Sequence, residues 1–136
     1  MKLMSLLLVT LALAGWTKAS QTIPREQTQA GLNEAAGNDL KAAEAEMTLL
    51  LDRLMTKAAG KTDAVAKLTK AQTAWKAYRD SQVEARWPFP ERRQYGSVYA
   101  MCVANELTNL TKARVAELRR MLTSVEGDVC ASQWPD

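Results

Sequence analysis

Histidine is absent from this chain of 136 residues, and cysteine occurs only twice. Because histidine is the commonest general base and a frequent metal ligand, its absence disfavours most hydrolytic and metal-dependent chemistry. The cysteines lack the spacing of a zinc site, and the sequence contains no phosphate-binding glycine loop or nucleophile elbow. We therefore predict a binding protein rather than an enzyme, with no catalytic residue, no cofactor and no metal.

The chain also lacks the strict alternation that marks β-strands, and it has no internal repeat. Apolar residues instead recur at steps of three and four, the pattern of an amphipathic helix. We expect helices over residues 28–57, 63–87 and 97–123, with Pro88 ending the second and Ser97 capping the third. Short connections then predict an all-α fold, an antiparallel three-helix bundle with a short C-terminal tail.

Each expected helix carries an apolar stripe that should face the core. The stripe of the first helix consists of Leu32, Ala36, Leu40, Ala43, Met47, Leu50 and Leu54. In the second helix the stripe includes a polar interruption and consists of Val65, Leu68, Gln72, Trp75, Tyr78 and either Gln82 or Val83. The stripe of the third helix consists of Met101, Ala104, Leu107, Leu110, Val115, Leu118 and Leu122.

The N-terminus has the features of a secretory signal peptide. Lys2 precedes an apolar run, and small residues offer cleavage after Ala14 or Ala19. The apolar run is shorter than the roughly 20 residues that span a bilayer, which disfavours the alternative of a membrane anchor. We predict a signal peptide over 1–19 and one helical domain over 20–136, located in the periplasm or secreted. Contact with the membrane is then expected only during export.

The formal charge of the full chain is +3, from 18 basic and 15 acidic residues. Cleavage after Ala19 removes Lys2 and Lys18 and no acid, which leaves 16 basic and 15 acidic residues, or +1. A nearly neutral domain without a basic patch does not indicate a nucleic acid partner.

Cys102 and Cys130 are the two cysteines. In an exported protein a disulfide is the usual state of such a pair, and we favour a bridge within the chain. An unbroken third helix would separate the two, so closure needs an extended tail or a helix that ends a turn early. Pairing between chains and two free thiols remain as alternatives.

Several motifs together resemble the LprI-type lysozyme inhibitor N-terminal domain, a small helical module of secreted bacterial proteins. Residues 75–80 resemble its W-x-x-Y-R-D signature, and Leu32-Asn33 its early L/M-N pair. Gly96-Ser97 resembles the start of its last helix, and residues 110–118 resemble its L-T-x-x-R-x-x-E-L ending. The resemblance covers about residues 28 to 122. It implies an exported protein whose partner is a lysozyme-like hydrolase.

This chain departs from the pattern of the family at its cysteines. Ala35 and Val83 stand at places where the family usually has cysteine, and Glu106 stands near the place of a third. The resemblance therefore implies that one disulfide of the family is lost here, and that its pairing pattern does not transfer.

The signature has a structural and a functional interpretation. In the structural one, which we favour, Trp75 and Tyr78 anchor the core and Arg79 stacks on the Trp75 indole. Arg114 would then face Asp80 or an acid of the first helix, such as Asp39 or Glu46, as an ion pair that fixes helix register. In the functional interpretation, Arg79 and Asp80 bind a ligand.

The proline-bounded loop after the second helix is rich in the residue types that dominate binding interfaces. Its prolines stiffen it, which lowers the entropy lost on binding. An alternative that we weigh equally is that Trp87 and Phe89 fold back over the bundle while the arginines are solvated. The candidate partner-binding residues are Trp87, Phe89, Arg92, Arg93, Tyr95, Ser97 and Tyr99.

Two functions of different kinds follow. The first is inhibition of lysozyme or a related cell-wall hydrolase, with Arg92, Arg93 or Tyr95 inserted between its catalytic carboxylates. The second is a structural or adaptor bundle of the bacterial envelope, or one that binds a small molecule. An inhibitor should expose the 88–97 loop with ordered aromatics. An adaptor should have a pocket between helices or a wide apolar face.

Overall fold

The computed structural model describes residues Ile23–Pro135, apart from the side chain of Glu26. The described chain contains helices and no strand, and its elements are η1 (Arg25–Gln27), α1 (Gln29–Lys57), α2 (Thr62–Arg86), η2 (Arg92–Tyr95) and α3 (Tyr99–Met121). The predicted all-α three-helix bundle is confirmed, and the helix bounds differ from the expected ones by at most two residues. The predicted signal peptide over residues 1–19 lies outside the described residues.

Local chemistry sets most of the helix ends. Thr28 caps α1, because its side-chain oxygen accepts a hydrogen bond from the Gly31 amide at 3.1 Å. Gly60 follows α1 with φ at 80°, a conformation that glycine adopts without steric cost. The prediction that Ser97 caps α3 is wrong, since that helix begins two residues later, after Val98. The Ser97 carbonyl instead accepts a hydrogen bond from Asn33 Nδ2 at 3.2 Å.

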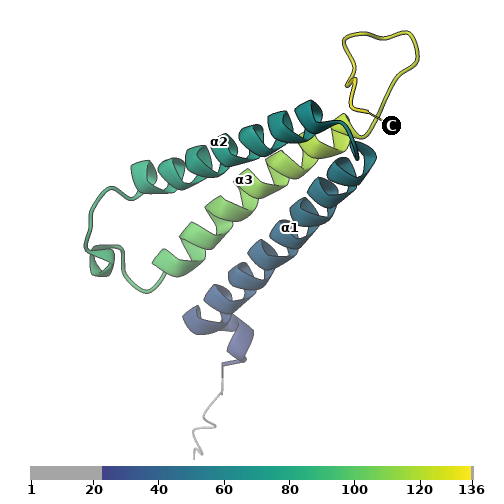
Figure 1. Cartoon of the computed structure of the whole chain (residues 1–136). Coiled ribbons are helices and arrows are strands. Elements are labelled where there is room, and N and C mark those ends of the chain that lie inside the picture. Colours follow the sequence, from purple (N-terminus) through teal and green to yellow (C-terminus); the bar gives the residue numbers. More distant parts are fainter. Residues whose placement is uncertain (1–22, 136) are drawn as a thin grey trace, which may run out of the picture.

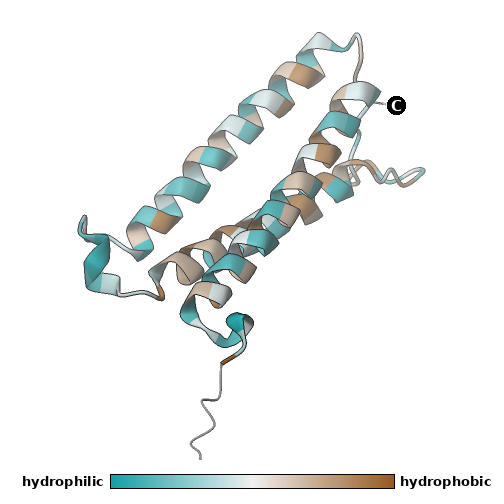
Figure 2. Ribbon diagram, turned by 90° about the horizontal axis from the view of Figure 1, so that it is seen from below, coloured by the Kyte–Doolittle hydropathy of each residue, from teal (hydrophilic) through white to brown (hydrophobic). Residues whose placement is uncertain are grey.

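Helices α1 and α3 pack closely side by side, whereas α2 stands farther from this pair (Figures 1 and 2). Small residues line much of the α1–α3 contact, which lets the two backbones approach: Gly31, Ala36, Ala43, Ala104, Thr108 and Thr111 are all buried. In α2, by contrast, only Leu68 and Gln72 are buried. The fold is therefore a tight helical pair with a more loosely attached third helix.

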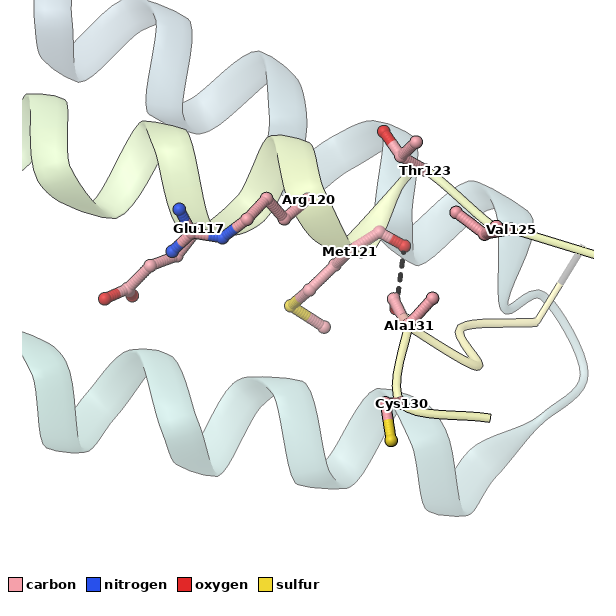
Figure 3. Close-up of a pocket in the computed structure, with 8 residues that line it drawn as sticks. Glu117, Arg120, Met121, Thr123, Val125, Cys130 and Ala131 are labelled. Carbon is pink, nitrogen blue, oxygen red and sulfur yellow. Dashed lines mark hydrogen bonds between the residues drawn. The ribbon is translucent and has the colours of Figure 1, made fainter. Parts of the chain in front are cut away.

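The aliphatic core lies toward the end of the bundle where the α1–α2 turn meets the C-terminal tail, which we name the closed end. Its buried members are Met47, Leu50, Leu54, Leu68, Val115 and Leu118. The tail returns to this core, as Trp134 packs against it and donates a hydrogen bond from Nε1 to the Leu54 carbonyl at 2.9 Å. Ser132 Oγ also donates to the Met121 carbonyl at 3.0 Å (Figure 3). The tail is therefore bonded to both α1 and α3.

Two members of the predicted stripes are exposed rather than buried. Tyr78 exposes 52% of its surface because the inward face of α2 passes through Trp75 and Arg79, one position away. Leu32 is 41% exposed, since the neighbouring Asn33 is the residue of this turn that reaches the start of α3. The remaining predicted stripe residues are buried or half-buried, with Val83 rather than Gln82 on the inward side.

The prediction of a Cys102–Cys130 bridge is wrong, because both cysteines are free. Helix α3 is unbroken from Tyr99 to Met121, so Cys102 lies near its start. Cys130 lies in the tail beyond the end of this helix (Figure 3). The helix rises about 28 Å between Cys102 and Met121, against the roughly 5.5 Å between Cα atoms that a disulfide requires.

None of the helices within residues 23–135 is long and apolar enough to cross a membrane.

Candidate functional site

The second half of α2, the loop after it and the start of α3 enclose one pocket of about 470 Å³. The pocket brings together two groups of residues that the sequence presented separately, the signature of α2 and the aromatic loop. Its lining residues are Arg79, Asp80, Val83, Glu84, Trp87, Phe89, Pro90, Arg92, Tyr99 and Leu107. The candidate site is this pocket together with the loop. Both lie at the end of the bundle opposite the closed end, and we name that end the loop end.

Four aromatic rings contact one another in successive pairs and hold the loop. Tyr95 and Tyr99 are stacked with their centroids 5.1 Å apart, and Trp87 meets Tyr99 edge-on at 6.0 Å. Phe89 lies 6.2 Å from Tyr95, and the Tyr95 hydroxyl accepts a hydrogen bond from the Phe89 amide at 2.7 Å. Such ring pairs add stability beyond the area they bury. The loop therefore has an internal framework of its own.

A turn at Gly96 returns the chain from this framework to α3. Gly96 has φ 72° and ψ −171°, a region of backbone space that only glycine occupies readily. The next residue, Ser97, is bound through its carbonyl to Asn33 of α1. Because Asn33 belongs to the L-N motif and Gly96-Ser97 to the G-S motif, these two motifs meet in space and attach the loop end to α1.

The predicted partner-binding residues separate into two sets by exposure. Trp87, Tyr95 and Tyr99 are half-buried within the stack. Ser97, Phe89, Arg92 and Arg93 are exposed: Phe89 exposes 58% of its surface and the Arg93 side chain 92%. Arg93 has one ion pair, with Glu91 at 3.5 Å, and a pair this exposed contributes little.

Arg79 links the pocket to α1. Its guanidinium carbon lies 5.4 Å from the centroid of the Trp75 ring, which is the stacking that their spacing predicts. It pairs with Asp80 at 2.9 Å and with Glu44 of α1 at 3.4 Å, and its side chain is only 18% exposed. Arg79 thereby joins α2 to α1 and holds the Asp80 carboxylate at the pocket.

The prediction that Arg114 faces Asp80, Asp39 or Glu46 is wrong. Arg114 donates from Nε to Gln72 Oε1 at 3.1 Å and pairs with Glu117 of its own helix at 2.9 Å. Arg114 lies beside the middle of α2 and therefore does not reach Asp80, which is farther along that helix. Glu46 instead forms an ion pair with Arg119.

Gln72 is a buried polar residue of the core whose hydrogen-bond partners the sequence did not identify. It accepts from Arg114 and also donates to the Met47 sulfur at 3.4 Å, so it connects all three helices. The signal for this role was its place as a polar interruption in the α2 stripe.

The tail covers another hollow of about 470 Å³, lined by Glu117, Arg120, Met121, Thr123, Val125, Cys130, Ala131 and Ser132 (Figure 3). It lacks aromatic side chains and lies away from every residue that the sequence singled out for binding. Within residues 23–135, no group of three or more Cys, Asp or Glu side chains is close enough to hold a metal ion. The loop end is therefore the stronger candidate.

The fold and the site define a small helical domain that presents a preorganised aromatic loop above a pocket. The family model described as "Lysozyme inhibitor LprI" matches residues 20–118, and the chain belongs to this family. An uncharacterized protein of Rhizobium meliloti (strain 1021) is 35% identical over 135 residues, which covers 90% of this chain and 94% of that protein. No solved structure gives a significant match.

Proposed function

We propose that this protein is exported and inhibits lysozyme or a related cell-wall hydrolase through its loop end. Membership of a family described as lysozyme inhibitors supports a protein partner of this kind. The observation that carries the proposal is the exposure of Phe89, Arg92 and Arg93 on a loop whose other aromatic residues pack against one another. A loop that is already ordered loses little entropy when it binds.

The target enzyme suggests how these three side chains act. Lysozyme cleaves its substrate with two carboxylates in a cleft. Arg92 and Arg93 supply guanidinium groups that form charge-assisted hydrogen bonds with carboxylates. Phe89 supplies an apolar anchor beside them, and such anchors contribute strongly at interfaces. Tyr95, whose hydroxyl is held by the Phe89 amide, supports the loop in this arrangement rather than entering the cleft.

Export is the second part of the proposal. The basic start, short apolar run and small residues of positions 1–19 support a signal peptide that delivers the domain to the periplasm or outside the cell. A hydrolase of the cell wall is encountered in those compartments. Fractionation of cells that express the full chain, with mass spectrometry of the N-terminus, tests both cleavage and location.

Inhibition is tested by following the lysis of cell walls by lysozyme with increasing amounts of the exported protein. The wild-type protein is expected to inhibit, and the double variant R92A/R93A is expected to lose at least about 100-fold in affinity, as for two interfacial charges. The control R53A/R120A removes the same charge near the closed end and should inhibit normally. Absence of inhibition by the wild-type protein at large molar excess would contradict the proposal.

The alternative function, an envelope bundle that binds a small molecule, is favoured by one observation. The pocket lies between helices, as that alternative predicts, and it shares its rim with the loop. The two functions are separable, because a small-molecule site is filled in the absence of any hydrolase.

A further inference from the structure

We infer that the pocket of the loop end binds a neutral sugar ring, with Phe89 as its stacking face and Asp80, Glu84 and Arg92 as its hydrogen-bonding groups. This inference goes beyond the proposed inhibition, because the binding requires no protein partner. It assigns a ligand class to a pocket that Trp87 and Tyr99 also line.

Phe89 supplies the apolar face of the pocket. This is the single phenylalanine of the chain, and it exposes 58% of its surface at the pocket. Its backbone amide donates a hydrogen bond to the Tyr95 hydroxyl at 2.7 Å, and its ring lies 6.2 Å from the Tyr95 ring, so the residue is held on two sides by Tyr95. A pyranose ring has an apolar C–H face that matches an aromatic ring in size and shape. An exposed, fixed aromatic face beside polar groups suits such a ring.

Three charged side chains supply the polar groups of the same pocket. Asp80 and Glu84 are four residues apart on α2, so they lie on one face of that helix, and Arg92 approaches from η2. Within residues 23–135, the side chains of Glu84 and Arg92 make no hydrogen bond or ion pair. Their carboxylate and guanidinium groups offer acceptors and donors together. Sugar hydroxyls both donate and accept, so they satisfy both kinds of group.

The same side chains disfavour other ligands. An apolar molecule would remove Asp80, Glu84 and Arg92 from water without replacing their hydrogen bonds, which is costly. A simple anion would meet two carboxylates, and Arg79 is already committed to Asp80 and Glu44. Two carboxylates on one helix face repel each other, and hydroxyl donors placed between them relieve this repulsion.

Nuclear magnetic resonance of the exported protein, titrated with triacetylchitotriose and separately with maltotriose, tests the inference. The indole N–H signal of Trp87 should shift and saturate at millimolar sugar. The signal of Trp134, at the closed end, should stay in place and serves as an internal control. Binding of both sugars indicates general recognition of a pyranose, and binding of the acetylated sugar alone indicates a glycan of the cell-wall type.

Variants separate stacking from charge. Phe89→Ala should weaken binding about tenfold, whereas Phe89→Trp should retain it. The pair D80A/E84A should also lose about tenfold, while the isosteric D80N/E84Q should lose less, because amides still bond to hydroxyls. Greater weakening by the amide pair than by the alanine pair would contradict recognition of a neutral ring, as would binding of deacetylated, cationic chitotriose alone.

The outcomes distinguish this inference from the proposed function. If the sugars shift Trp87 but lysozyme is not inhibited, the pocket assignment stands and the inhibition fails. If lysozyme is inhibited but neither sugar moves Trp87, the pocket assignment is overturned and the inhibition stands.

Discussion

The closed end and the loop end use tryptophan and its neighbours in opposite ways. At the closed end, Trp134 packs against an aliphatic core, and its indole N–H donates a hydrogen bond to the Leu54 carbonyl. At the loop end, Trp87 and two tyrosines pack against one another, and they support Phe89 and two arginines that face solvent. Aromatic residues at one end stabilise the bundle, and those at the other end shape a surface.

This difference indicates where changes in sequence should affect stability and where they should affect binding. The α1–α3 pair and the closed end contain every buried large aliphatic side chain of the described core. The loop end has none, and its order depends on ring stacking, one glycine turn and the hydrogen bond from Asn33 to the Ser97 carbonyl. The residues that stabilise the fold and the residues proposed to bind a partner thus lie at opposite ends of the bundle.

The largest loss of stability should follow from Leu54→Ala. Leu54 is fully buried at the closed end, and truncation of such a residue costs about 2–5 kcal/mol. Urea unfolding followed by circular dichroism measures the change in free energy. The matched variant Leu49→Ala, on the same helix but 59% exposed, should change it by less than about 0.5 kcal/mol. Equal losses in the free energy of unfolding for the two variants would contradict the assignment of Leu54 to the core and of Leu49 to the surface.

An intermediate and local effect is expected for Gly96→Ala. A Cβ at Gly96 meets no atom within 4 Å, so the cost of about 1–3 kcal/mol comes from the backbone conformation alone. Inhibition of lysozyme should weaken, because the loop loses its fixed path back to α3. Gly37→Ala provides the control, since it also has open space but lies in a regular helix, and it should stabilise the protein by about 0.5–1 kcal/mol. A change in melting temperature of the same sign for both variants would contradict this explanation.

The smallest effect is expected for Trp134→Phe at the closed end. This change keeps an aromatic ring against the core and removes the hydrogen bond to the Leu54 carbonyl, a loss of about 1 kcal/mol. The carbonyl still accepts from the Ala58 amide, which limits the cost. Unfolding experiments should show this small decrease with unchanged inhibition. A large loss of inhibition would mean that the tail takes part in binding.

The fold was predictable from the sequence because its elements are marked by local signals. Proline at 88, glycine at 60 and the three-and-four spacing of apolar residues bound the helices within two residues of their observed ends. Contacts between residues that are far apart in the sequence were not predictable from such local signals. Charge predicts an acidic partner for Arg114 on another helix, whereas the structure places it against Glu117 of its own helix and against Gln72, a neutral side chain that contacts all three helices.

The sequence singled out the aromatic and basic loop and Asp80, but it gave no signal for Glu84 and did not show how these residues are arranged. Composition identified the aromatic and basic loop, yet it did not separate the supporting Tyr95 from the exposed Phe89, because both are aromatic and in the same loop. The pocket arises where α2 continues into this loop, so it joins Asp80 and Glu84 to residues that follow Pro88. The role of Trp134 depends on a contact across 80 residues of sequence, for which no local pattern exists.

The most direct measurement is a map of amide shifts when the isotope-labelled protein binds lysozyme. Binding through the loop end predicts that the perturbed amides gather at residues 79–99, with Phe89, Arg92 and Arg93 among the most affected. Residues 122–135 of the tail should remain unchanged. Perturbations centred on the tail and the closed end, or none at a concentration where lysozyme is inhibited, would contradict the assignment of recognition to the loop end.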